Sequence, residues 1–156
     1  MLEPLKQFIC DKCGETIKSP RDGWVEWLEQ GDDTMYNSQY GFKIVHADPK
    51  CYFYPDREYP GSNSTPLTHF TGEGGYTWLL CFLDLGPLLM KDYKGPRVKD
   101  MREFVELMRR LTLPYYEEVR LYAGSLRTSE NFVADNSFYE QENLKKIIQE
   151  LSQDRR

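Results

Sequence analysis

The sequence of 156 residues predicts an α+β fold, in which a small β-rich N-terminal part packs against about four C-terminal helices. Residues 1–60 hold short aromatic and β-branched segments divided by turn residues, a pattern typical of strands. Residues 67–153 hold longer segments whose apolar positions recur every three or four residues, which is typical of amphipathic helices. The length, with 40% hydrophobic and 29% charged residues, favours one folded domain over residues 1–156.

Strands are expected at four places in the N-terminal part. Residues 8–9 and 16–18 flank a tight turn and are expected to pair as a hairpin. A Ser-Pro-Arg-Asp-Gly turn signal separates this hairpin from a strand at residues 24–28. Residues 31–39 are polar and predict a loop, and a strand is expected at residues 41–46.

The turn of the expected hairpin is half of a candidate metal site. Cys10 and Cys13 are separated by two residues, and Gly14 supplies the positive φ that lets backbone N–H groups face the thiolates. Downstream, His46 ends a predicted strand and Cys51 follows five positions later. The four side chains form a Cys3His set suited to tetrahedral zinc, so the sequence predicts a structural zinc.

Bringing the two halves together closes a loop of 32 residues between Cys13 and His46. Loop closure costs about 3 kcal/mol, whereas a structural zinc contributes on the order of 10–16 kcal/mol at neutral pH. Three alternatives stay open: Cys10 and Cys13 are a redox pair, they are free surface cysteines, or His69 replaces His46. Cys81 lies in an apolar run and is expected to be a small buried hydrophobe.

Residues 8–14, Phe-Ile-Cys-Asp-Lys-Cys-Gly, resemble the knuckle of zinc-ribbon proteins, which use such turns to build structural metal sites. The second half of this site is a His-x4-Cys step rather than another Cys-x2-Cys knuckle. The resemblance implies a structural zinc with no activity attached.

The segment from residue 48 to residue 66 contains four prolines and is predicted to be irregular. It carries a group of aromatic side chains beside the proposed ligand Cys51. These are Tyr52, Phe53, Tyr54 and Tyr59. They either shield the metal and fill a small core, or present Tyr52, Tyr54 and Tyr59 as a surface that contacts a partner.

Four helices are expected in the second half. Residues 76–85 are apolar on all sides and predict a short buried helix, which a Gly-rich hinge or cap precedes. Residues 97–111 show helical spacing, with a solvated face on which Arg110 pairs with Glu106 at i,i+4.

The last two helices have recognisable start signals. Thr112 and the following proline predict the N-cap and first turn of a third helix that runs to about residue 126. Residues 127–136 read as a polar connection. Ser137 and Glu140 form a capping box that begins the fourth helix.

The formal net charge of −5 argues against general nucleic-acid binding. One segment, residues 91–127, is nevertheless basic, with nine basic and six acidic side chains. Nucleic-acid binding through this segment, chiefly residues 91–110, is therefore kept as an alternative. Its candidate contacts are Lys91, Lys94, Arg97 and Lys99.

The longest apolar run has six residues, far from the ~20 needed to span a bilayer, and the N-terminus lacks a signal pattern. We therefore expect a cytoplasmic protein, in which a Cys-x2-Cys pair more often serves metal or redox chemistry than a structural disulfide.

The expected function is a non-catalytic, zinc-stabilised interaction or regulatory module that recognises another protein. Three thiolates and an imidazole leave no open position for a reactive water, and no hydrolase motif occurs. The alternative is a hydrolase-like enzyme with a cleft between the zinc lobe and the helices, using His69 with Asp56 or Glu58.

Overall fold

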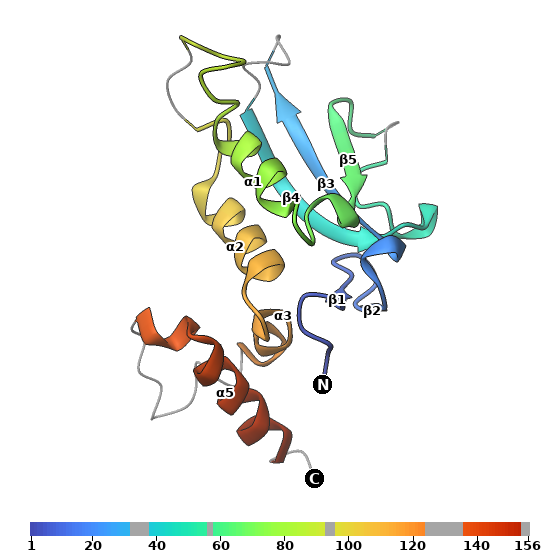
Figure 1. Cartoon of the computed structure of the whole chain (residues 1–156). Coiled ribbons are helices and arrows are strands. Elements are labelled where there is room, and N and C mark those ends of the chain that lie inside the picture. The colour runs from blue at the N-terminus through green and yellow to red at the C-terminus, as the bar shows by residue number, and fades with distance from the viewer. Residues whose placement is uncertain (32–37, 56–57, 93–95, 124–135, 154–156) are drawn as a thin grey trace.

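The computed structural model of the chain describes residues 1–31, 38–55, 58–92, 96–123 and 136–153 (Figure 1). The β-strands lie in the N-terminal part and four described α-helices lie in the C-terminal part. The predicted α+β class is therefore confirmed.

The strands form two antiparallel sheets. They are β1 (Phe8–Ile9), β2 (Thr16–Ile17), β3 (Gly23–Gln30), β4 (Ser38–His46) and β5 (Ser62–Pro66). The first two pair as the expected hairpin, and the other three form a sheet in the order β4-β3-β5. β3 is the central strand of this sheet. In its pairing with β4, His46 at the end of β4 lies opposite Gly23 at the start of β3.

Two predictions about the strands were wrong. The polar loop expected over 31–39 is too long, because β4 begins at Ser38, and the residues from 32 to 37 lie outside the described chain. The irregular segment 48–66 contains the edge strand β5, whose polar sequence gives no strand signal and whose pairing with β3 fixes its conformation. Pro66 is tolerated there because it ends an edge strand.

A bulge in β4 brings Gly41 into the left-handed region. Between the pairs Glu26 with Lys43 and Leu28 with Tyr40, β4 contributes one more residue than β3. Gly41 has φ +69°, which matches the requirement of such a bulge for a residue without Cβ.

Helices α1 (Gly75–Leu83) and α2 (Met101–Thr112) pack with the sheet to form the main core. Phe82 of α1 lies at its centre and makes ring contacts with Trp27, Phe42 and Phe104 at centroid distances of 5.0 to 6.1 Å. These contacts join the sheet to both helices.

A second, smaller core lies at the far end of the molecule from the sheet (Figure 1). It is formed by α3 (Tyr116–Val119) and α5 (Gln141–Gln153). Its buried side chains are Tyr116, Val119, Leu144 and Ile148.

The helix at 76–85 is shorter and less buried than predicted. It starts at Gly75 directly after the N-cap residue Gly74, so the Gly-rich stretch does cap it. An added Cβ on Gly75 would lie 2.3 Å from the Phe70 carbonyl oxygen, which explains why this position is a glycine. Tyr76 and Leu80 are each 59% exposed, and only one face of α1 contacts the core. An apolar composition on all sides therefore did not produce burial on all sides.

Both later start signals were misread. Thr112 is the last residue of α2, where its hydroxyl donates to the Met108 carbonyl at 2.7 Å, and α3 begins only after Tyr115, which has φ +70°. Ser137 lies in a 3-10 helix, Asn136–Tyr139, and α5 begins at Gln141. The end predicted for the third helix and most of the 127–136 connection lie outside the described residues.

Candidate metal centre

The hairpin of β1 and β2 carries the first two candidate ligands. Cys10 and Cys13 lie in its turn, which closes through a hydrogen bond from the Gly14 N–H to the Cys10 carbonyl at 2.9 Å. Gly14 has φ +77°, as the spacing predicted. The Cys10 N–H donates to the Glu15 carbonyl at 2.9 Å, so the turn is fixed on both sides.

The other two candidate ligands come from β4 and the turn after it. His46 is the last residue of β4, and Cys51 ends a 3-10 helix, Pro49–Cys51. The carboxylate of Asp48 caps this helix by accepting the Lys50 N–H at 2.9 Å, and the fixed φ of Pro49 suits its first position.

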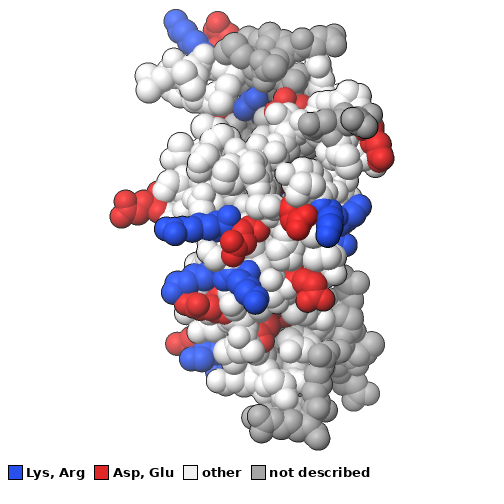
Figure 2. All heavy atoms as spheres, turned by 90° about the vertical axis from the view of Figure 1, so that its right-hand side faces the viewer, with Lys and Arg blue, Asp and Glu red and all other residues white. Residues whose placement is uncertain are grey.

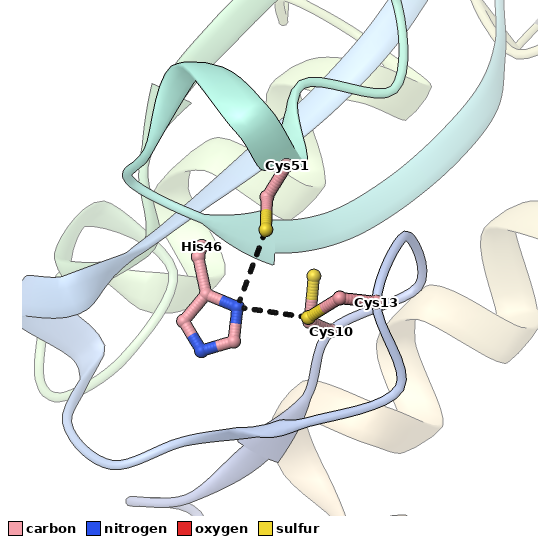
Figure 3. Close-up of side chains that lie close together, drawn as sticks. All are labelled: Cys10, Cys13, His46 and Cys51. Carbon is pink, nitrogen blue, oxygen red and sulfur yellow. Dashed lines mark hydrogen bonds between the residues drawn. The ribbon is translucent and has the colours of Figure 1, made fainter.

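Figure 3 shows the four side chains directed toward one point. Their potential ligand atoms all lie within 4.8 Å of one another. His46 Nδ1 is 3.5 Å from the Cys13 sulfur and 3.8 Å from the Cys51 sulfur. Cys10, Cys13, His46 and Cys51 therefore lie close together and could bind a metal ion.

The surroundings of His46 Nε2 indicate that Nδ1 is the nitrogen available to a metal. Nε2 lies 3.4 Å from the backbone carbonyl oxygen of Thr16 in β2. A carbonyl oxygen can only accept, so this contact places the ring proton on Nε2 and leaves the Nδ1 lone pair facing the thiols. Carbonyl partners of this kind orient histidine ligands in metal sites.

The pKa values of Cys10 and Cys51 are shifted in opposite directions. Burial opposes ionisation of Cys10, but hydrogen bonds from the backbones of Cys13, His46 and Lys12 outweigh it and lower its pKa to about 7. Burial, hydrogen bonding to Cys13 and the charge of Cys10 raise the pKa of Cys51 to about 12. A bound cation would offset the repulsion among three thiolates.

A buried ion network connects this site to the helices, and the sequence pattern did not lead us to predict it. Arg110 of α2 is 4% exposed, and its guanidinium donates to Asp11 at 2.7 Å and to both carboxylate oxygens of Glu117 at 2.8 Å. The prediction that Arg110 is a solvated partner of Glu106 was wrong. A buried position needs compensating charges, and Asp11 and Glu117 provide them.

Asp11 links the two halves of the candidate metal site. It lies between Cys10 and Cys13, and its carboxylate accepts the N–H of Ile44 at 2.7 Å. Its own N–H donates to the Ile44 carbonyl at 2.8 Å, two residues before His46. These two bonds dock the hairpin turn on β4.

The aromatic side chains of 52–59 divide into two groups. Tyr52 and Tyr59 are 37% and 40% exposed. Phe53 packs against the main core, and the hydroxyl of Tyr54 donates to the Gly41 carbonyl at 2.8 Å. Buried Glu26 holds this segment by accepting the N–H groups of Phe53 and Tyr54 at 2.8 and 3.1 Å.

The two described residues of the hydrolase proposal, His69 and Glu58, do not line a common groove. His69 is exposed, stacks on Trp78 at a centroid distance of 5.4 Å, and does not belong to the Cys/His cluster. Glu58 lines a groove of about 590 Å³ beside β5 that does not include His69. Asp56 lies outside the described residues.

The four basic candidates for nucleic-acid contact do not form one exposed patch. Arg97 is 7% exposed, and the Lys99 ammonium donates to Gln30 at 2.7 Å and lies over the Tyr40 ring. Lys91 is exposed, and Lys94 lies outside the described residues. On the face in Figure 2, basic and acidic side chains are interspersed without a broad area of one sign.

Comparisons of the chain with protein-family models, with curated proteins and with solved structures found no match. Among the described residues, no helix combines the length and apolar character that a membrane span requires. What can be inferred about function therefore comes from the site itself.

Proposed function

We propose that this protein is a zinc-stabilised interaction module, in which Cys10, Cys13, His46 and Cys51 hold a structural zinc and a neighbouring surface binds another protein. The observation that carries the proposal is the convergence of four nitrogen and sulfur ligand atoms within 4.8 Å. Cys3His is one of the usual ligand sets of structural zinc sites.

The distances support zinc in particular. Zinc bonds of about 2.3 Å to sulfur and 2.0–2.1 Å to nitrogen, at tetrahedral angles, separate the two ligand atoms by about 3.5 Å. His46 Nδ1 lies 3.5 and 3.8 Å from the sulfurs of Cys13 and Cys51. These two distances match a bound zinc, and the ligand atoms that lie farther apart, within 4.8 Å, would draw together around the metal.

A structural role is favoured over a catalytic one. Four protein ligands complete a tetrahedral shell, whereas a catalytic zinc keeps one position for water. Three thiolates also donate enough charge to leave the metal a poor Lewis acid. In this proposal the metal contributes folding free energy rather than chemistry.

The interaction surface is placed at Tyr52 and Tyr59. Tyr52 directly follows the ligand Cys51, and the segment is held by Glu26, so the surface has a rigid support. Tyrosine offers a large contact area at a low cost in side-chain entropy. Tyr54 belongs to the same cluster, since its ring contacts that of Tyr59 at 5.2 Å.

The metal is tested by elemental analysis of protein purified without chelator, with about one zinc per chain expected. The Cys13→Ser variant should lose the metal. Cys81→Ser is the matched control, because Cys81 is the one cysteine outside the cluster. Wild-type protein without stoichiometric metal, or zinc retained in full by Cys13→Ser, would overturn the assignment.

The surface is tested by comparing the proteins that copurify with wild type and with a Tyr52→Ala, Tyr59→Ala double variant that still binds zinc. Tyr76→Ala is the control, since Tyr76 is exposed on α1 outside the 52–59 segment. We expect a partner that the control retains and the double variant loses. If the double variant keeps every partner, the surface lies elsewhere.

A further inference from the structure

A second site lies away from the metal cluster, where α1 packs near the start of β4. A cavity of about 460 Å³ opens there, and none of the four metal-ligand candidates lines it. Its walls are largely apolar and include the side chains of Trp27, Trp78, Phe82 and Leu85. Its volume falls in the range of about 300–1,000 Å³ that is usual for small-molecule sites.

The cavity also has a polar wall, with Gln39 as its most informative member. Gln39 is 4% exposed, and its Nε2 donates to Glu29 Oε1 at 3.3 Å. Because a carboxylate oxygen can only accept, this bond fixes the orientation of the amide and makes Oε1 the remaining acceptor. Oε1 is covered and receives no hydrogen bond from the described residues, so a donor in the cavity reaches it after a small shift of the side chains over it.

The backbone holds this wall firmly in place. The Gln39 N–H donates to the Arg97 carbonyl at 2.7 Å, and the Lys99 N–H donates to the Gln39 carbonyl at 2.9 Å. The Arg97 guanidinium in turn donates to the Cys81 carbonyl of α1 at 2.9 Å. Sheet, connecting segment and helix are thus held together around the cavity, so its backbone framework is formed in advance of a ligand.

An apolar cavity with a buried acceptor selects its ligand by two criteria. The aromatic walls favour a flat ring system, which can pack against Trp27, Trp78 and Phe82. A buried acceptor without a partner disfavours a ligand that cannot donate to it. We propose that this cavity binds a small aromatic molecule whose N–H or O–H donates to Gln39 Oε1.

The test uses a matched pair of probes, indole and 1-methylindole, which differ in one N–H donor. The chain has three tryptophans, so a ¹H–¹⁵N spectrum of ¹⁵N-labelled protein should show three indole N–H signals. Trp27 and Trp78 line the cavity, whereas Trp24 does not. Titration with indole should shift the first two signals and leave that of Trp24 in place.

We expect indole to bind wild type about five- to tenfold more tightly than 1-methylindole, as one net hydrogen bond predicts. In Gln39→Met the acceptor is lost at similar side-chain volume, and the two probes should bind about equally. If the Trp27 and Trp78 signals stay unmoved at millimolar indole, the proposal fails. Equal affinities of the two probes for wild type would overturn it as well, whether or not the variant folds.

Discussion

Removing the guanidinium of Arg110 is the sharpest perturbation that the structure offers. Arg110→Met keeps much of the side-chain volume but leaves two carboxylates, Asp11 and Glu117, without their buried counter-charge. It also removes the hydrogen bond to the Ile9 carbonyl at 2.9 Å. Breaking a buried ion pair by deleting one partner costs about 3–5 kcal/mol of stability, and that is the loss we expect.

The same change should weaken metal binding. Asp11 lies between two candidate ligands and docks the hairpin on β4. Without Arg110 its carboxylate keeps only the partly exposed Arg120, at 3.8 Å, as a counter-charge, and this should disturb the geometry of Cys10 and Cys13. Groups just outside a metal's ligands typically change its affinity by 10- to 100-fold, and we expect about tenfold. Stability is measured by urea unfolding of the zinc-saturated protein, and affinity by competition with a chromophoric chelator.

Two further variants separate the ion network from a general effect of losing charge. Arg102→Met removes an exposed charge from the same helix and should change stability by less than about 0.5 kcal/mol. Adding Glu117→Gln to Arg110→Met removes one of the two carboxylate charges that faced Arg110, and it should recover part of the lost stability. If Arg110→Met unfolds within about 1 kcal/mol of wild type and binds zinc equally well, the network does not support the site.

Four smaller predictions complete the set. Removing zinc with a strong chelator should lower the melting temperature of wild type, and a Cys13→Ser variant should melt like the chelated protein in calorimetry. Gly41→Ala should destabilise by about 1–3 kcal/mol or more in urea, because φ is +69° and the new Cβ would lie 2.6 Å from the Tyr54 hydroxyl. Burial and the charge of a nearby carboxylate raise the pKa of Tyr54 to about 12, so the stability advantage of wild type over Tyr54→Phe should be constant below pH ~10 and shrink as pH rises toward 12. Replacing Lys91 and Lys99 with Gln should leave stability within about 0.5 kcal/mol per site, and wild type should not bind DNA or RNA at physiological salt; a steep salt-dependent affinity that both changes abolish would contradict this.

The ligand cluster was accessible from sequence because its geometry is set locally. Two residues between Cys10 and Cys13, followed by Gly14, favour one tight turn, which contacts with β4 then hold in place. The alternating pattern of β4 placed His46 at a strand end, and that end meets the start of β3. Short-range stereochemistry and one strand pairing were enough to bring the four side chains together.

The role of Arg110 was not accessible, because a charged residue at helical spacing usually faces solvent. A signal was present: Leu107 and Leu111 are buried, and Arg110 lies on the same side of α2, three positions after the first and one before the second. Its burial depends on Asp11, 99 residues away in sequence, and no local pattern reveals such a partner. Strand β5 was missed for a related reason, since pairing with β3 rather than its own composition keeps it extended.

The hairpin that carries Cys10 and Cys13 has strands of two residues each, too short to be stable alone. Its inward side chains nevertheless belong to the main core, since Phe8 and Ile17 are fully buried there and Cys10 is 1% exposed. A metal that ties this hairpin to His46 and Cys51 would therefore hold one wall of the main core, and its binding free energy would stabilise the sheet and helices packed against that wall. The ion pair between Asp11 and Arg110 also stabilises the position of the hairpin, because it fixes the hairpin turn to α2. Loss of the metal should accordingly destabilise the sheet as well as the turn. The size of that destabilisation depends on how firmly Asp11 and Arg110 alone hold the hairpin turn against β4 and α2.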